Sequence, residues 1–422
     1  MLHDKLKNYF EEQKEEYLKI FTDLVSIDTQ TIEQGIGGGK EINGQQYLEK
    51  LLSSMGAVIQ QDPILEETVQ EGLHRFHEGN PGHNNEQRYN LIADFQGEGN
   101  ERSLLFNGHI DTMPAGDPDK WERPPLAAVL EGGRCYGLGT SDMKAGLAAA
   151  ICGVKLIQDA GIALPGKVRI VSVVDEEGGG NGSLSATMHG YNADAAVICE
   201  PTNCRIITAN MGFIFFRIRV KGVSLHAGMK KMGVNAIEKA MKLIGALHEL
   251  EKCWNTQYTH PELPPPSINI GSIKGGLAAS AVPGECEFKL CLHYIPKAMT
   301  YESVYKEVTG ALDKASGEDG WLSENPPEIE VYQQGDGFEM DRADPFVQEV
   351  YSTCRAVMGT GELAVSYTGN DARYYQKIAR IPTVILGPGH PDKGHRPNEY
   401  IEIQNFYHCI LVYANLILRW CR

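Results

Sequence analysis

The first 134 residues of this chain contain no cysteine, and the ten cysteines that follow include no Cys-x-x-Cys pair. Scattered cysteines of this kind indicate reduced, mostly buried thiols and argue against a disulfide framework. The sequence also lacks any block of Lys and Arg, and its formal net charge is -16. Both features argue against nucleic acid and against an anionic membrane surface as partners. We therefore expect a cytoplasmic protein that acts on small molecules.

Long apolar runs are absent as well, since no stretch approaches the roughly 18 apolar residues of a transmembrane helix. The N-terminus carries a charged amphipathic pattern, in which Leu6, Phe10, Tyr17 and Phe21 are spaced for one face of a helix. It lacks the apolar core of a signal peptide. Hydrophobic residues make up 42% of the 422 positions, which is enough to build a large core. At about 150 residues per domain, the length predicts two or three domains.

What the sequence does contain is a series of short patches of metal-ligand residues. In chain order the patches hold His109 and Asp111, Asp142, Glu176 and Glu177, Glu200, and His395. Most of them follow short apolar runs bounded by Gly or Pro, which are typical of buried parallel strands. These runs are 104–106, 168–174, 195–199 and 383–386. Because active sites gather at the carboxyl ends of parallel strands, we expect the patches to converge on one edge of one sheet.

The types of ligand indicate the metal. Two imidazoles with several carboxylates and no thiolate suit two Zn²⁺ ions, with Co²⁺ or Mn²⁺ as alternatives, whereas an all-oxygen set would suit Mg²⁺ or Ca²⁺. Asp142 lies between the other ligands in the sequence and is the natural bridge, because a carboxylate can give one oxygen to each ion. Two ions about 3.5 to 4 Å apart share a water and lower its pKa, which is chemistry suited to amide hydrolysis.

Two pairs of neighbouring residues have further expected roles. In His109-x-Asp111 both side chains leave an extended strand on the same side, so we expect Asp111 to accept the second ring N–H of His109. Glu176 and Glu177 are adjacent, and at a turn into the glycines 178–180 both can face the site. One of the two then binds metal, while the other stays free as a general base.

Several motifs resemble the M20 metallopeptidases, a family that includes acetylornithine deacetylase, succinyl-diaminopimelate desuccinylase, aminoacylase and several carboxypeptidases. The motifs are residues 107–114, 136–146, 175–178 and 199–202. Residues 386–400, which end in His395-Arg396-Pro397-Asn398-Glu399-Tyr400, are most similar to the acetylornithine deacetylase branch.

The resemblance implies a division of the ligands between two metals. His109 and Glu200 hold one ion, Glu177 and His395 hold the other, and Asp142 bridges them. Glu176 becomes the proton shuttle. His390, five residues before His395 in the same loop, is the alternative ligand, but the residues after His395 match the family pattern better.

Residues 212–332 have the element order strand, helix, strand, strand, helix, strand. The predicted strands are 213–221, 267–274, 286–294 and 328–332, and the predicted helices are 235–252 and 301–315. This order predicts a ferredoxin-like unit, residues 212–334, inserted into a discontinuous catalytic domain of residues 1–211 and 335–422. The fold class is then α/β, with a mixed, mostly parallel sheet flanked by helices. The resemblance implies that the inserted unit is a lid or a dimerisation domain, so we expect a homodimer.

The resemblance also implies substrate contacts. His226 lies where the family presents a His that polarises the scissile carbonyl, often from the partner subunit, and the alternative is a structural His. Asn370 and Arg373 hold the other end of the substrate, unless Asp371 and Arg373 pair to brace a loop. Two further positions depart from the family, because Ser280 replaces a usual Asn and His293 replaces an Arg that clamps a carboxylate. Neither residue reproduces the bidentate fork of Arg.

The resulting hypothesis is a di-zinc amidohydrolase that cleaves a small N-acyl amino acid or a related N-acyl amine, as acetylornithine deacetylase does. The changes at Ser280 and His293 keep two alternatives open, a di- or tripeptidase or carboxypeptidase, and a deformylase of an N-formyl heterocyclic amine. A metal-bound but inactive binding protein is a further alternative, and retention of Glu176 beside a complete ligand set argues against it.

One segment, residues 66–90, has mixed charges, three histidines and no regular apolar face. Its histidines, His74, His77 and His83, are not spaced for a common face. The segment therefore predicts a solvated surface insertion and not a further metal site.

Overall fold

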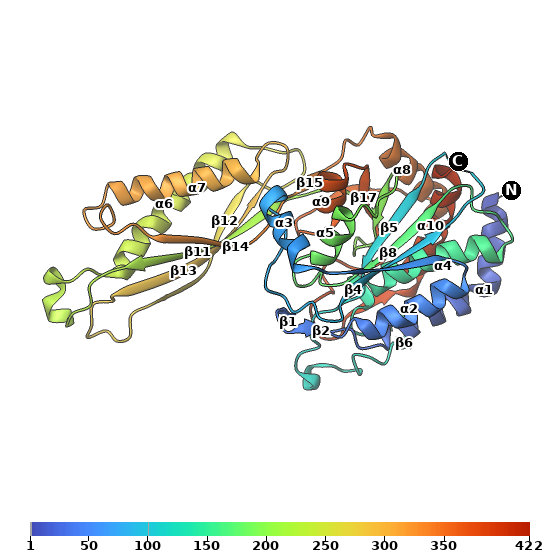
Figure 1. The fold of residues 1–422 in the computed structure, drawn as a ribbon, viewed down its shortest axis with the longest axis horizontal. Helices are drawn as coiled ribbons and strands as arrows, with labels where there is room; N and C mark the ends of the chain where they lie inside the picture. The colour runs from blue at the N-terminus through green and yellow to red at the C-terminus, as the bar shows by residue number, and fades with distance from the viewer. Residues whose placement is uncertain (1, 100) are drawn as a thin grey trace. The chain divides into compact units, whose positions relative to one another are not determined.

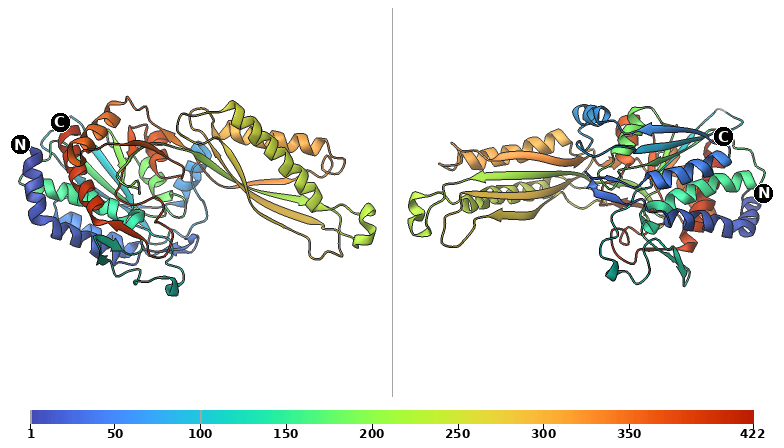
Figure 2. Two further views of the ribbon diagram at one scale, coloured as in Figure 1. Left: turned by 180° about the vertical axis from the view of Figure 1, so that it is seen from behind. Right: turned by 60° about the horizontal axis from the view of Figure 1, so that its bottom comes forward.

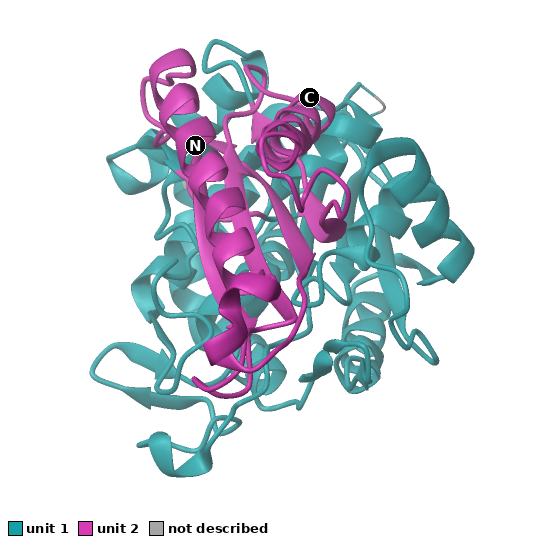
Figure 3. Ribbon diagram, turned by 90° about the vertical axis from the view of Figure 1, so that its left-hand side faces the viewer, with its two compact units in different colours: residues 1–208, 340–365, 370–422 teal, residues 209–339, 366–369 magenta. Residues whose placement is uncertain are grey.

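The computed structural model describes residues 2–99 and 101–422, so that Met1 and Asn100 lie outside the described residues. The chain divides into two compact units (Figure 3). Unit 1 comprises Met1–Thr208, Met340–Val365 and Asn370–Arg422, and unit 2 comprises Ala209–Glu339 and Ser366–Gly369. Unit 1 is therefore built from segments on both sides of unit 2.

Unit 1 is organised around a mixed sheet, of which Figure 1 labels β17, β5, β8 and β4. The strand order across it is β10-β17-β9-β5-β8-β4-β3. Its four central strands, β17, β9, β5 and β8, are parallel, and the strands beside them are antiparallel. The bounds are β3 (Val58–Pro63), β4 (Tyr89–Phe95), β5 (Leu104–His109), β8 (Val168–Val173), β9 (Ala196–Ile198), β10 (Ile206–Asn210) and β17 (Thr383–Ile385), with β16 (Leu363–Ser366) pairing β10. The four apolar runs predicted to be parallel strands are the four central strands, so this prediction is confirmed.

Helices cover both faces of this sheet (Figure 2). On one face α4 (Ala145–Asp159) packs on β5 and β8 and contacts α1 (Leu2–Val25) and α10 (Ile403–Trp420). On the other face α5 (Asn181–Met188) packs on β4 and β8, and α3 (Glu66–Phe76) packs on α5. Unit 1 also contains α2 (Ile42–Ser54), α8 (Pro345–Met358) and the short helix α9 (Ala372–Tyr374). Both faces of the central strands are covered, which explains why every residue of β5 and β8 is buried.

The apolar character of the helices matches their burial. The sequence of α4 is apolar on nearly all sides, as expected for a helix enclosed between a sheet and other helices. In α1, by contrast, Leu6, Phe10, Tyr17 and Phe21 are buried on one face, so the predicted amphipathic helix is confirmed. None of the described helices is long and apolar enough to cross a bilayer.

Two small sheets complete unit 1. The first is a hairpin of β1 (Thr31–Gly35) and β2 (Gly38–Gly39). The second has the order β18-β7-β6, with β6 (Val129–Glu131), β7 (Arg134–Tyr136) and β18 (Tyr400–Glu402). Because β18 pairs with β7, the second sheet brings the loop of His395 to the segment that leads into Asp142.

Unit 2 is an antiparallel sheet with the order β12-β13-β11-β14 and two helices. Its elements are β11 (Gly212–Lys221), α6 (Ala236–Gln257), β12 (Ser267–Gly275), β13 (Glu285–Tyr294), α7 (Tyr301–Gly317) and β14 (Glu328–Gly335). Ile214, Phe216, Ile218 and Val220 alternate along β11 and are buried in one core with residues of both helices. A short strand, β15 (Phe338–Glu339), pairs with Ala209 and Asn210. The predicted α/β fold with a ferredoxin-like unit is confirmed.

The prediction of a surface loop over residues 66–90 is wrong. Residues Glu66–Phe76 form α3, and β4 begins at Tyr89. Between them Glu78, Asn80 and Arg88 are buried. The pattern was misleading because the only buried residues of α3 are Thr68, Val69 and Gly72, and because the buried charges are neutralised by residues distant in the sequence.

Candidate metal centre

The carboxyl ends of three neighbouring strands deliver the first members of the candidate centre. His109 is the last residue of β5, Glu176 and Glu177 follow β8, and Glu200 follows β9. His109 Nε2 lies 3.9 Å from Glu176 Oε2 and 3.9 Å from Glu200 Oε1. Asp142 joins them from the kinked segment η2 (Thr140–Lys144), in which its own φ and ψ are not helical, with its Oδ1 3.0 Å from His109 Nε2.

His395 completes the group from the loop between β17 and β18. Its Nε2 lies 2.7 Å from Glu177 Oε2 and 3.4 Å from Asp142 Oδ2. Asp142 therefore presents one carboxylate oxygen to each imidazole. This is the arrangement that a carboxylate shared by two cations requires.

Electrostatics also favour cations at this place. Burial, followed by repulsion from neighbouring carboxylates, raises the pKa of Glu200 well above its ordinary value. Burial is likewise the first cause that raises the pKa of Glu176, to which Asp371, Glu177 and Asp142 add. Several carboxylates enclosed together can all ionise only when positive charge is present among them. Two sets of side chains each bring three N or O atoms within 4.8 Å of one another. One set is His109, Glu176 and Glu200, and the other is His109, Asp142 and Glu177. The residues therefore fit a site for divalent metal.

The Asp111 side chain has a different partner from the one predicted. The Nδ1–H of His109 donates to the backbone carbonyl of Asp111 at 2.9 Å, while the carboxylate oxygen is 3.8 Å from Nδ1. The carboxylate instead accepts the backbone N–H groups of Glu176, at 3.3 Å, and of Glu177, at 3.1 Å. The prediction failed because β5 ends at His109, so the two-residue alternation of a strand does not extend to Asp111.

Glu399 is a member of the site that sequence reasoning missed. Its buried carboxylate accepts the backbone N–H groups of Gly139, Ser141 and Asp142 at 2.9, 2.6 and 3.0 Å. Burial raises the pKa of Glu399 to about 8. The pairing of β18 with β7 places the carboxylate beneath the turn that carries Asp142. The sequence offered one signal for Glu399, its place in the motif that begins at His395. No pattern indicated that its side chain is buried.

We expect Glu399→Gln to weaken metal binding about 10- to 100-fold, the usual effect of removing a partner behind a ligand. A Gln side chain has one acceptor oxygen, and its NH₂ group would face an N–H of the Asp142 turn. Metal affinity measured by competition with a chromogenic chelator checks this result. The matched control is Glu12→Gln on the exposed face of α1. Equal metal affinity in the two variants would contradict the role of Glu399.

His390, the alternative ligand, is held elsewhere. Its Nε2 pairs with Glu402, and its backbone N–H donates to Ser141 Oγ at 2.7 Å. Its ring also packs edge-on against Tyr400. The structure therefore brings His395, and not His390, to Asp142 and Glu177.

The predicted substrate contacts in unit 1 are buried. Arg373 is 4% exposed and donates to Glu78 Oε2 at 3.0 Å, to the carbonyls of Asn370 and Gly179 at 2.7 and 3.1 Å, and to the Tyr374 hydroxyl at 2.6 Å. Arg373 forms an ion pair with Glu78, and Asp371 also interacts with it electrostatically. Asp371 accepts the Ser183 hydroxyl at 2.6 Å. Asn370 accepts the N–H of Ala372 at 3.0 Å and is also buried.

The other predicted contacts belong to unit 2. His226 is exposed, and its Nδ1 accepts the backbone N–H of Gly228 at 3.1 Å. The carbonyl of Ser280 accepts the N–H of Ala227 at 2.8 Å and so anchors the loop of His226. His293 lies in β13, where burial lowers its pKa.

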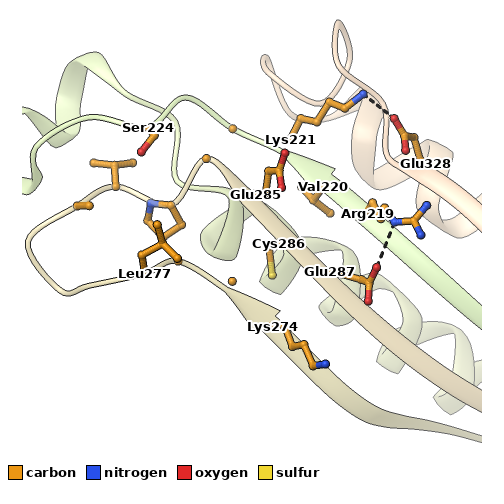
Figure 4. Close-up of a pocket in the computed structure, with 17 residues that line it drawn as sticks. Arg219, Val220, Lys221, Ser224, Lys274, Leu277, Glu285, Cys286, Glu287 and Glu328 are labelled. Carbon is orange, nitrogen blue, oxygen red and sulfur yellow. Dashed lines mark hydrogen bonds and ion pairs between the residues drawn. The ribbon is translucent and has the colours of Figure 1, made fainter.

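Unit 2 also contains a pocket of about 830 Å³, lined by the ends of β11, β12 and β13 and by the turn that joins β12 to β13 (Figure 4). Two of its cations are paired with its own carboxylates, Arg219 with Glu287 and Lys221 with Glu328. None of the predicted metal ligands lines it.

Comparisons with known proteins point to one family of peptidases. The sequence profile of peptidase family M20/M25/M40 matches residues 105–419. An N-formyl-4-amino-5-aminomethyl-2-methylpyrimidine deformylase from Halalkalibacterium halodurans is 32% identical over 356 residues, which cover 79% of this chain and 83% of that protein. An acetylornithine deacetylase from Edwardsiella ictaluri is 31% identical over 345 residues, covering 81% of this chain and 86% of that protein.

Solved structures share the fold at lower sequence identity. A tripeptidase from Staphylococcus aureus has a TM-score of 0.72 and 21% identity, covering 96% of this chain and 98% of its own. A dipeptidase from Saccharomyces cerevisiae has a TM-score of 0.72 and 16% identity, covering 100% of this chain and 99% of its own. With the profile matching most of its length and a relative at 32% identity, the chain belongs to peptidase family M20/M25/M40 and is a metal-dependent amide hydrolase.

Proposed function

We propose that this chain is a di-zinc amidohydrolase that removes the acyl group from a small N-acyl amino acid or a related N-acyl amine. In this proposal His109 and Glu200 hold one ion, Glu177 and His395 hold the other, and Asp142 bridges them. The observation that carries the proposal is the placement of the two Asp142 oxygens, one beside each imidazole. Zinc suits a site with two imidazoles, and Co²⁺ or Mn²⁺ would be accepted by the same ligands.

Glu176 is the proposed general base. When bound, the two ions would lower the pKa of a water molecule and polarise the scissile carbonyl. Among the described residues, the Glu176 carboxylate has no hydrogen-bond donor, and its side chain is 17% exposed. It is therefore available to take a proton from the attacking water and to return that proton to the leaving amine.

His226 is the proposed donor to the oxyanion. Because Nδ1 accepts the N–H of Gly228, the neutral ring carries its proton on Nε2. A ring held in this tautomer can donate from Nε2 to an oxygen that becomes negative in the transition state. Unit 1 is then the catalytic domain, and unit 2 is the lid and dimerisation domain that presents His226, from the same chain or from a partner.

The substrate proposal depends on positions 280 and 293, which we propose to lie beside the substrate. Neither Ser280 nor His293 can form the bidentate, permanently charged clamp that Arg gives to a carboxylate. A substrate with a weakly held or absent carboxylate fits these residues. This favours, as a second candidate, an N-formyl heterocyclic amine, the kind of substrate named for the 32% identical relative. In unit 1, buried Arg373 donates to the carbonyl of Gly179, in the turn that follows Glu177, and to the carbonyl of Asn370.

A panel of N-acetyl, N-succinyl, N-formyl and dipeptide substrates tests this proposal. We expect kcat/KM for the best N-acyl amine to exceed that of every dipeptide by at least about 100-fold, since about 2.7 kcal/mol of differential transition-state binding gives that ratio. The Glu176→Gln variant is the control for contaminating hydrolases. Dipeptides cleaved faster than all N-acyl amines would make the protein a peptidase, and no chelator-sensitive hydrolysis at all would make it a binding protein.

We further propose a cytoplasmic homodimer. The ten cysteines are all free thiols, as expected in a reducing compartment. Small N-acyl compounds are the proposed partners of the site, and the net charge of -16 argues against nucleic acid and anionic membranes. Sedimentation equilibrium of the intact chain tests the dimer, and a mass of one chain at micromolar concentration would contradict it.

A further inference from the structure

The turn that carries Glu176 and Glu177 begins at an unusual residue. Asp175 has a φ of +64°, in the left-handed region that residues other than Gly rarely adopt. Its carbonyl accepts the N–H of Gly180 at 2.8 Å, and the Glu176 carbonyl accepts the N–H of Gly179 at 2.8 Å. The reversal at Asp175 allows both glutamates to face the same side, although they are adjacent.

The Asp175 side chain is fully buried and is held by three donors. Arg88 Nη1 donates to Oδ1 at 2.9 Å, while His83 Nδ1 and Asn181 Nδ2 donate to Oδ2 at 2.8 and 2.7 Å. Arg88 also pairs with Glu41. A buried carboxylate needs such donors, because a lost partner is not replaced by water in an enclosed site.

Two glycines lie close to the His83 ring that contacts Asp175. A Cβ added at Gly35 would lie 2.6 Å from His83 Nδ1, and one added at Gly178 would lie 3.0 Å from its Cε1. Because these two positions are glycines, the β1–β2 hairpin and the turn that carries Glu176 and Glu177 can both approach the His83 ring closely. The His83 side chain is 8% exposed, and its ring nitrogen points to Asp175 and not to solvent.

Glu176 depends on this backbone support. On one side the Asp111 carboxylate accepts the N–H groups of Glu176 and Glu177, and on the other side Asp175 is clamped by His83, Arg88 and Asn181. Among the described residues the Glu176 carboxylate has no hydrogen-bond donor, and its nearest cationic partner is His109 Nε2 at 3.9 Å. The turn therefore sets the direction in which the Glu176 side chain leaves the backbone.

We propose that His83 and Arg88, from the segment between α3 and β4, are positioning residues that hold Glu176 in place through Asp175. This inference rests on the proposed function, in which Glu176 is the general base. His83 is the better residue to test, since Arg88 also neutralises buried Glu41 and its loss would unpair two carboxylates.

The test compares His83→Leu with His83→Asn. Leu keeps the bulk without a donor, whereas the Asn amide places an N–H close to the position of Nδ1. At saturating zinc we expect kcat of His83→Leu to fall about 10- to 100-fold, with KM within about twofold of the wild type and the bound metal unchanged. His83→Asn should recover most of the lost kcat. If His83→Leu does not fold, His83→Gln replaces it, because its amide reaches the position of Nε2 and leaves Asp175 without the donor.

Amide hydrogen exchange of residues 175–180 gives a readout independent of turnover. We expect exchange at Glu176 and Glu177 to accelerate about tenfold or more in His83→Leu and to stay at the wild-type rate in His83→Asn. Wild-type kcat in His83→Leu, a loss that His83→Asn does not recover, or a loss explained by missing metal would overturn the proposal. Glu176→Gln is measured in parallel, since full activity in that variant would instead refute the proposed function.

Discussion

Replacing Glu176 by Gln is expected to lower kcat about 10³-fold or more while the bound metal is retained. Gln keeps the size and polarity of the side chain but cannot take a proton from water at neutral pH. A positioned general acid and base contributes typically about 10² to 10⁴ in rate. Because Glu176 is not one of the proposed metal ligands, the affinity for metal should stay close to that of the wild type.

The measurement is kcat under saturating substrate together with the metal content of the same sample. The control is Glu318→Gln, an exposed residue after α7 in unit 2. Loss of activity in proportion to lost metal would make Glu176 a ligand and not the base. Substantial turnover with full metal content would refute the assignment of Glu176.

Asp142→Asn is expected to remove both the second metal ion and activity. The carboxylate presents Oδ1 at 3.0 Å from His109 Nε2 and Oδ2 at 3.4 Å from His395 Nε2. An amide has one oxygen and one NH₂ group, and the NH₂ group cannot ligate a cation. The variant also loses the negative charge that is shared between the two ions. We expect a fall in kcat/KM of about 10³-fold, within the range of a lost Lewis acid and its activated water.

Metal stoichiometry by elemental analysis, before and after dialysis, checks the result for Asp142→Asn. Asp313→Asn, on the exposed side of α7, is the matched control. A variant that keeps two ions per chain and its activity would show that Asp142 is not the bridge.

The convergence of the ligands could be predicted because it depends on short-range patterns. The apolar runs that became β5, β8, β9 and β17 are bounded by Gly or Pro, and parallel strands place their carboxyl ends at one edge. The ferredoxin-like unit was predictable for the same reason. Its strand β11 alternates between buried and more exposed residues, and its helices have a regular apolar face.

The supports behind the ligands could not be predicted, because they depend on contacts between distant segments. His83 and Arg88 lie in a segment whose mixed charges indicate solvent, and yet they contact Asp175, about 90 positions further along the chain. Glu399 contacts the Asp142 turn through the pairing of β18 with β7. The position of the Asp111 carboxylate was predicted wrongly from the two-residue alternation of side chains along a strand. The strand β5 ends at His109, two residues before Asp111.

Zinc titration of the metal-stripped protein tests the central claim most directly. Hydrolysis of the best N-acyl substrate is followed while Zn²⁺ is added in steps and the bound metal is counted. The account predicts no turnover without metal, and activity that reaches its maximum when two ions are bound to each chain. Hydrolysis that persists after complete removal of metal, or full activity with a single ion per chain, would contradict it.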